Sequence, residues 1–523
     1  SKTAQVVVHW PSMAMMMQIH LVFLASILRF ASAQFPQWHW FQHNCFDLLE
    51  EPLSDAPFRH NETARLLRHF AENFDVNRTG AIIASPGATP ALAVPGGYRF
   101  HWIRDGALSM SALLRSGGNF GLGQSEVSEE KMEATFLQYM DWVELLHQRP
   151  NTSIDEPKWN IEKAEPYALG WCRPQTDGPP LRARTLMQAA RRWRRHAGKL
   201  WDLAKKDLDW LIAKEDGTSN MNKETCDLWE ETTSTDFFWN KAMMQAALLE
   251  GIYHSQEVGD TARVESYAKA LLDDLGDVTN GHRQWGIFGS FLTECPVGDY
   301  SSDSCAQYRK QIDGAVILGL VHMRTMTPPT NASWMPATAT PPPTSELVAD
   351  TVKAYNKQFC SLYAVNQAES QGKSRWPGVL YGRYAKDTYG SQDGGNPWVL
   401  ITAALANLLY QAAEYSTETP LTRQEVAAWK AALNADSNFV ASPKNFLAAG
   451  DSVLVRLRMH ISVQDDWHLF EQIDRTSGQQ YNAKDLTWSY AEVLNALVTR
   501  QAAAAKIALA AGARGARLGA VVV

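Results

Sequence analysis

Several features are scarce in this chain of 523 residues, and each scarcity excludes a class of protein. The six cysteines form no CxxC pair and no His/Cys cluster, so no metal site is expected. A net charge of −7 and a pI of about 6.1 argue against nucleic acid or an anionic membrane as partner. Apart from one short stretch near the start, no segment is apolar enough to span a bilayer. The glycine-rich residues 117–123 have no preceding strand and no following Lys-Ser/Thr, so we expect no nucleotide cofactor.

Segments that alternate apolar and polar residues are also scarce, whereas helical periodicity dominates after residue 58. The predicted helices are roughly 58–74, 105–117, 127–147, 181–196, 199–214, 235–256, 260–276, 308–324, 345–364, 398–415, 422–436 and 485–501. About a dozen helices joined by long polar loops favour an all-α fold, an (α/α)6 barrel with two concentric helix layers. In such a barrel the long loops gather at one end and carry function.

The N-terminal region has the pattern of a secreted protein. Residues 1–33 are interpreted as upstream residues plus a signal peptide, because the apolar residues 19–28 precede Ala31-Ser32-Ala33. Four glycosylation sequons also fit secretion, and they begin at Asn61, Asn77, Asn151 and Asn331. The six cysteines allow fifteen pairings, among which Cys295 and Cys305 flank a polar turn and could close a small loop.

The remaining chain is predicted to be one domain, residues 34–500. Within it, residues 325–346 are rich in Pro and Thr and are predicted to form an exposed loop. Residues 501–523 are rich in Ala, Gly and Arg and are expected to be a frayed helix followed by a disordered tail. No further binding module is expected after residue 500, and the protein is expected to be a monomer.

Tryptophan is abundant, with 19 residues, and its flat face suits the apolar face of a sugar ring. Four loop segments also place acidic groups among aromatic residues and arginines, which together suit sugar hydroxyls. These segments are residues 98–105, 226–231, 381–398 and 470–490. Hydrolysis of a glycosidic bond usually needs two carboxyl groups, which in an inverting enzyme lie on opposite faces of the sugar. Such a pair can come from loops far apart in sequence.

Six motifs resemble those of the fungal-type glucoamylases of glycoside hydrolase family 15, in the family's order across roughly residues 60–500. They are WIRDGA at 102–107, EPKWN at 156–160, WCRPQTDGPPLRA at 171–183, DLWEE at 227–231, GRYAKDTY at 382–389 with GNPW at 395–398, and EQID at 471–474 with AKDLTWSYA at 483–491. The resemblance implies an (α/α)6 barrel that releases glucose from the non-reducing ends of α-1,4 and, more slowly, α-1,6 glucans. It implies an α-glucan partner, no cofactor and secretion.

The resemblance also implies roles for individual residues. Glu230 matches the general acid, Glu471 the general base, and Asp227 an acidic residue one helical turn before the acid that tunes or orients it. Like charge from Asp227 and Glu231 is expected to keep Glu230 protonated, and activity is expected to be bell-shaped and acidic in its pH dependence. The substrate-binding set is Tyr98, Trp102, Arg104, Asp105, Trp171, Leu228, Trp229, Glu231, Arg383, Trp398 and Trp488.

Other interpretations stay open at the level of sequence. Glu230 and Glu231 could be an exposed pair at a helix start, Arg383 a structural ion-pair partner, and Trp398 and Trp488 core residues. The chain could also prefer another linkage, or be a non-catalytic glycan-binding or regulatory barrel. Three departures from the family stand out. Cys172 occupies a position usually held by a small residue, so it either narrows the pocket or forms a disulfide. The insertion at 325–346 is unusual, and no starch-binding module is expected.

Overall fold

Six helices contact one another in a closed ring within the compact unit Asn44–Val523 of this computed structural model. In ring order they are α3 (Ile103–Ser116), α5 (Gly178–Arg192), α7 (Phe238–Val258), α11 (Gly314–His322), α13 (Val399–Tyr415) and α16 (Thr487–Val521), which returns to α3. The structure describes residues 44–87, 97–117, 127–286, 289–296, 311–324, 340–367, 376–391, 394–461 and 465–521. The signal-like segment, Asn331, Cys305 and most of the loop 325–346 lie outside these residues.

The composition of the ring helices explains why they lie inside. Helix α13 reads VLITAALANLLYQAAEY, and nearly all of its side chains are buried. Helix α7 is likewise buried on every side. A helix that is apolar all round has no face suited to water, and its many alanines allow neighbouring backbones to approach closely.

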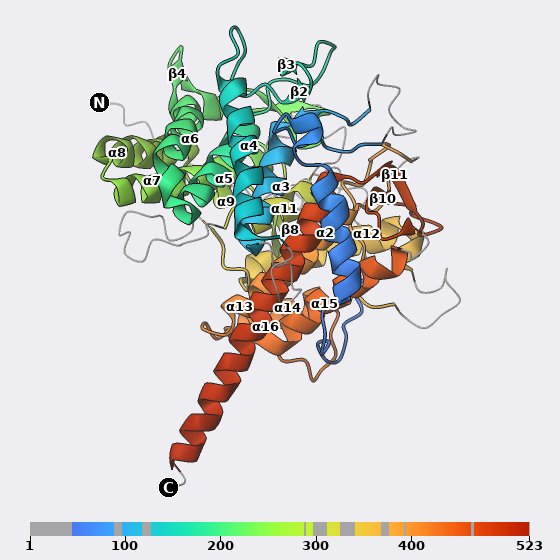
Figure 1. Cartoon of the computed structure of the whole chain (residues 1–523). Coiled ribbons are helices and arrows are strands. Elements are labelled where there is room, and N and C mark those ends of the chain that lie inside the picture. The colour runs from blue at the N-terminus through green and yellow to red at the C-terminus, as the bar shows by residue number, and fades with distance from the viewer. Residues whose placement is uncertain are drawn as a thin grey trace, which may run out of the picture. The chain divides into compact units, whose positions relative to one another are not determined.

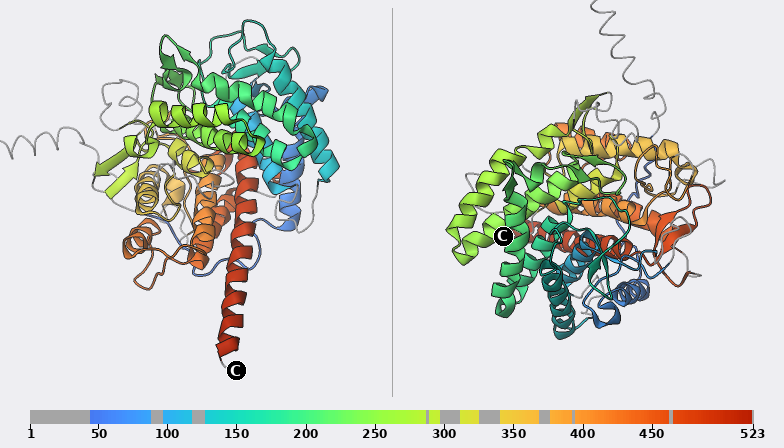
Figure 2. Two further views of the ribbon diagram at one scale, coloured as in Figure 1. Left: turned by 90° about the vertical axis from the view of Figure 1, so that its left-hand side faces the viewer. Right: turned by 90° about the horizontal axis from the view of Figure 1, so that it is seen from above.

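A second layer alternates with the ring along the chain. It consists of α2 (His60–Glu72), α4 (Glu129–His147), α6 (Ala197–Ile212), α8 (Thr261–Ala270), α12 (Glu346–Leu362) and α15 (Pro443–His460), with the additional helices α9 (Val278–Gly281) and α14 (Arg423–Ala432). The alternation can be followed by colour in Figures 1 and 2. Outer and inner helices alternating six times make the predicted (α/α)6 barrel.

Three helices differ from the sequence-based expectation, and one of them is the short α9, which was not predicted. Helix α15 was not predicted, although Ser442 caps it and Pro443 opens it. Its Gly450 permits the ring of Tyr410 on α13 to approach so closely that a Cβ atom would lie 2.3 Å from it. Helix α16 continues to Val521, so the expected disordered tail is helical in the structure (Figure 1).

The strands are short and lie in the connections between helices. One three-stranded sheet has the order β1 (His101–Trp102), β2 (Lys158–Asn160), β3 (Glu165–Pro166). Four antiparallel hairpins complete the set: β4 (Lys214–Glu215) with β5 (Thr218–Ser219), β6 (Thr225–Cys226) with β7 (Thr233–Ser234), β8 (Arg283–Gly286) with β9 (Gly289–Leu292), and β10 (Phe470–Ile473) with β11 (Gln480–Lys484).

Two disulfides join distant parts of the chain, Cys45–Cys360 and Cys172–Cys226. Cys295 is also disulfide-bonded. Its predicted partner, Cys305, lies outside the described residues.

A buried ion pair links three helices on one side of the barrel. Asp207 on α6 accepts hydrogen bonds from Nε of Arg182 on α5 at 2.9 Å and from Nε2 of His147 on α4 at 3.0 Å. Asp207 is fully buried and Arg182 is 1% exposed. Removing one partner of a buried pair leaves the other charge uncompensated, which costs more than the pair contributes.

We therefore expect Asp207→Ala to lower the free energy of unfolding by about 3–5 kcal/mol. Asp202→Ala on the same helix is the matched control. Its side chain is 68% exposed and forms a surface ion pair with Lys205, so its loss should cost less than about 1 kcal/mol. Urea unfolding of both variants measures the difference, and equal losses would contradict it.

Candidate active site

A cavity of about 360 Å³ lies where the ring helices begin. Every predicted site residue except Asp227 lines it: Tyr98, Trp102, Arg104, Asp105, Trp171, Leu228, Trp229, Glu230, Glu231, Arg383, Trp398, Glu471 and Trp488. Five of the six motifs, spread over almost 400 residues, thus contribute to one cavity, and EPKWN at 156–160 does not line it. Trp398 and Trp488 are both buried, and both also line the cavity, so each is a core residue and a lining residue at the same time.

The starts of the ring helices supply much of this site. Trp102 precedes α3, Asp177 precedes α5, Asp313 precedes α11 and Trp398 precedes α13. Helix N-termini carry partial positive charge and unpaired N–H groups. The cavity therefore lies at the end of the barrel where acidic side chains are favoured.

Glu230 lies in the turn between β6 and β7, with a positive φ of 65°. Its Oε1 atom accepts three hydrogen bonds: from Nε1 of Trp102 at 2.9 Å, from a guanidinium N–H of Arg104 at 3.0 Å, and from Nε2 of Gln175 at 2.9 Å. Among the described residues no side chain or backbone group bonds Oε2. One carboxyl oxygen is thus fixed by the protein, while the other is left for a ligand.

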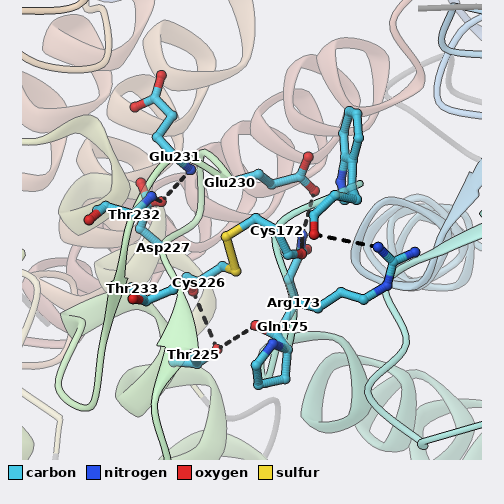
Figure 3. The surroundings of a disulfide bond; sticks show 12 residues. Cys172, Arg173, Gln175, Thr225, Cys226, Asp227, Glu230, Glu231, Thr232 and Thr233 are labelled. Carbon is cyan, nitrogen blue, oxygen red and sulfur yellow. Dashed lines mark hydrogen bonds between the residues drawn. A yellow bond between two sulfur atoms is a disulfide. The ribbon is translucent and has the colours of Figure 1, made fainter. Parts of the chain in front are cut away.

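Asp227 lies in the same loop as Glu230. Residues 227–230 form a turn and no helix, so the predicted spacing of one helical turn between Asp227 and Glu230 is wrong. Its carboxylate accepts hydrogen bonds from the backbone N–H groups of Glu231 at 2.8 Å and Thr232 at 2.9 Å (Figure 3). Glu231 is paired with Arg383 at 2.9 Å. Asp227 therefore shapes the loop that presents Glu230, and the helix-start interpretation of Glu230 and Glu231 is wrong.

The disulfide Cys172–Cys226 fixes the base of this loop (Figure 3). It joins the segment that carries Gln175 to the residue directly before Asp227. The disulfide confirms one of the two expectations for Cys172, and the residue also lines the cavity.

Two arginines hold opposite parts of the cavity. Arg104 donates to Glu230 and to Asp177 at 3.1 Å, and its Nε lies 3.5 Å from Asp105. Burial raises the pKa of Asp105 to about 6, although Arg104 opposes this shift.

Arg383 donates from Nε to Asp387 at 2.9 Å and pairs with Glu231. Its guanidinium also lies 5.3 Å from the ring centre of Trp398. Arg383 is therefore both an ion-pair partner and a lining residue.

Glu471 lies on β10 in a different environment. Its Oε1 accepts from the hydroxyl of Tyr98 at 3.0 Å, and its Oε2 accepts from Nδ2 of Asn482 on β11 at 2.5 Å. The hydroxyl of Tyr389 lies 2.7 Å from that of Tyr98. Burial raises the pKa of Glu471 to about 8, more than these hydroxyls and Arg383 lower it.

Sequence reasoning missed Gln175, Tyr389 and Asn482. Gln175 and Tyr389 lie inside the motifs at 171–183 and 382–389, and Asn482 directly precedes the AKDLTWSYA motif, but only the fold shows which carboxyl each contacts. Trp229 was predicted to bind substrate, and its indole Nε1 donates to Asp313 at 2.8 Å, which links the loop of residues 227–231 to α11.

A second cavity, of about 300 Å³, lies toward the other ends of the ring helices. Its lining contains no Trp, Tyr or Phe among the described residues. Its carboxylates also have cationic partners, Glu250 with Arg184 at 2.9 Å and Glu414 with Lys506 at 2.8 Å. It therefore lacks the stacking surface and available acids that a sugar-cleaving site needs.

Among the described residues, one group could offer three ligand atoms to a metal: His69, Asp466 and His468, whose ligand atoms lie within 4.8 Å of one another. The two imidazole rings are stacked, with their centres 3.8 Å apart. His69 Nε2 contacts the carbonyl oxygen of Asp466 at 3.1 Å, and the Asp466 carboxylate is paired with Arg65.

The family model of glycosyl hydrolases family 15 matches residues 67–498. The chain belongs to glycosyl hydrolase family 15. It is similar to a glucoamylase of Blastobotrys adeninivorans, with 27% identity over 465 residues that cover 80% of this chain and 68% of the relative. Glucoamylase-1 of Arthroderma benhamiae is 29% identical, with 83% and 68% covered.

Solved structures confirm the barrel. The family 15 glucoamylase from Hypocrea jecorina superposes with a TM-score of 0.66 at 24% identity, covering 84% of this chain and 71% of that one. The glucoamylase from Saccharomycopsis fibuligera gives 0.65 at 21% identity, covering 88% and 99%. Membership makes the chain a glycosidase of the glucoamylase type with an α-glucan substrate.

The burial of Glu471 has a measurable consequence for stability. Below about pH 4.5 its carboxyl is protonated in the folded and the unfolded chain alike. Between pH 4.5 and 8 only the folded chain keeps the proton, so the wild type loses stability as the pH rises. Glu471→Gln has no such loss. Its stability advantage is expected to be small at pH 4 and to grow to the order of a few kcal/mol by pH 8. Unfolding measured at both pH values tests this, and a constant difference would contradict it.

Proposed function

We propose that the chain hydrolyses α-1,4 glucans, and α-1,6 links more slowly, from the non-reducing end with inversion, releasing β-D-glucose. The observation that carries the proposal is the meeting of Glu230 and Glu471 in one cavity, each in its own hydrogen-bond environment. Inversion needs about 6.5–9.5 Å between the two carboxyl groups, which admits a water molecule.

In this proposal Glu230 is the general acid. Because Oε1 is held by three N–H donors, the proton would be on Oε2, where it can pass to the departing glycosidic oxygen. Arg104, Asp105, Arg383 and Glu231 would bind the hydroxyls of the terminal glucose, and charged hydrogen bonds of this kind fix orientation. The tryptophans would stack on the sugar rings.

Glu471 is the proposed general base that activates water. Its raised pKa by itself favours the reverse assignment, with Glu471 as the acid and Glu230 as the base. The family resemblance and the free Oε2 of Glu230 support the first assignment. The two assignments predict different effects of the leaving group on the rates of Glu230→Gln and Glu471→Gln.

Glu230→Gln and Glu471→Gln separate the roles. Loss of the acid should slow maltose hydrolysis by about 10²–10⁴-fold and partly spare glucosyl fluoride, whose leaving group needs little protonation. Loss of the base should slow both substrates, since both need an activated water. Rates of both variants on both substrates are the measurement. The opposite pattern would reverse the assignment, and near-wild-type maltose turnover would remove a residue from the mechanism.

The pH dependence is also expected to depart from the sequence-based expectation. A bell-shaped profile of kcat/KM reports apparent pKa values of the coupled pair. Because the pKa of Glu471 is raised to about 8, one limb moves toward that value, and activity should extend to less acidic pH than the sequence predicts. Initial rates on maltoheptaose from pH 3 to 9 test this. A profile without a falling limb anywhere between pH 3 and 9 would argue against both carboxyl roles.

We further propose secretion. Disulfides form and persist in oxidising compartments, and the sequon residues Asn61, Asn77 and Asn151 are exposed. Among the described residues no helix is long and apolar enough to cross a membrane. The family itself leaves the compartment open, because a Saccharomyces cerevisiae relative, 23% identical, is named as intracellular.

Expression in a secreting host should give cleavage near Ala33–Gln34 and a glycan on at least one of the four sequons. Intact mass before and after glycosidase treatment of the medium measures both. An intracellular, unglycosylated product that retains Met13 would contradict secretion.

A further inference from the structure

A lysine lies directly behind the tryptophans of the cavity. In the antiparallel pair of β1 and β2, Lys158 is opposite Trp102, so their side chains project from the same face of the sheet. Phe100, two residues before Trp102, shares that face. The neighbouring Trp159 and His101 project to the other side, where Trp159 is part of a hydrophobic core cluster. The register alone therefore places an ammonium group among aromatic rings.

Four rings surround the Nζ atom of Lys158. Their centres lie 3.5 Å away for Trp171, 3.9 Å for Tyr167, 4.5 Å for Trp102 and 4.6 Å for Phe100. Lys158 is fully buried, and its Nζ has no hydrogen-bond partner within the part of the chain that the structure describes. A buried cation without such a partner is costly, and aromatic faces offset only part of that cost. Burial accordingly lowers the pKa of Lys158 to about 8.

The charges around Lys158 come from few groups. Glu230 attracts the ammonium and Arg173 repels it, but Arg173 is itself bound to Glu156 at 2.8 Å. On α3, Arg104 donates to Glu230 and Asp105 lies against Arg104. On β3, Glu165 is exposed to solvent. Glu230 is thus the acidic group that the charge of Lys158 acts on.

The caged lysine is connected to the acid through one of its own rings. Trp102 contacts the ammonium with its face and donates from Nε1 to Oε1 of Glu230. A cation on the face of an indole draws electron density from the ring, which strengthens the N–H as a donor. Trp171, the ring nearest to the ammonium, lines the cavity.

We propose that Lys158 is a positioning residue for the general acid. Its caged ammonium holds the rings of Trp102 and Trp171 in place, and its positive charge sets the pH at which Glu230 releases its proton. The inference rests on the proposed function, because it gives Lys158 a part in the work of Glu230.

Lys158→Met keeps most of the side chain and removes the charge, and Lys163→Met is the matched control. Lys163 follows on the same segment but is exposed. The limb of the wild-type pH profile that belongs to Glu230 is identified first. It is the limb that disappears when the Glu230→Gln variant is assayed with glucosyl fluoride. Without the cation, Glu230 should hold its proton longer, so this limb should move to higher pH by roughly half a unit or more. Maltose kcat/KM should fall about tenfold or more, whereas Lys163→Met should behave as wild type.

A purely structural role would lower kcat/KM and leave the limb in place, and that result would overturn the proposal. If Lys158→Met does not fold, Tyr167→Ala keeps the charge and opens the cage to water. Water would then screen the charge of Lys158, so the Glu230 limb should move to higher pH by a smaller amount than in Lys158→Met. An unmoved limb would again overturn the proposal. A wild-type enzyme that releases no glucose from maltoheptaose would instead overturn the proposed function, and the inference with it.

Discussion

The buried guanidinium of Arg104 is the contact on which the site depends. From the first turn of α3 it bonds Asp177 at the start of α5 and Glu230 in the acid loop, and it lies 5.7 Å from the ring centre of Trp488 on α16. The side chain of Arg104 therefore links three ring helices and Glu230. Arg383 has the corresponding place on the other side, between Asp387 and Glu231. A guanidinium suits this work because its donors are planar, fixed in direction and always charged.

The ring of helices supplies the second constraint. Because chain segments enter each inner helix at the same end, the residues just before the helices converge without any long-range sequence signal. The short strands then set the directions of the side chains. Residues on one face of β1 and β2 point to the cavity, and those on the other face point to the core. A change of register by one residue would exchange the two sets.

The sequence was sufficient for the barrel and for most of the lining, because those depend on helical periodicity and on motifs with local meaning. It was insufficient where the direction of a side chain depends on tertiary contacts. Asp227 and Glu231 are close to Glu230 in sequence, and only the fold shows that their carboxylates bind backbone N–H groups and Arg383, respectively. Helix α15 was missed although Ser442 caps it and Pro443 opens it, and its Gly450 admits the ring of Tyr410. The sequence identified Lys158 only as part of the EPKWN motif, because its aromatic surroundings come from the fold.

Several charged groups of this site are buried away from water, and their burial lowers the stability of the folded chain. Glu471, Asp105 and Lys158 all have pKa values displaced toward neutrality by burial, so each destabilises the folded chain in its charged form. Two interactions hold the loop that carries Glu230: the Cys172–Cys226 disulfide directly before Asp227, and the Asp227 carboxylate, which accepts from the loop's backbone N–H groups. They support a loop in which Glu230 has a positive φ, a conformation that persists only where the surrounding structure holds it.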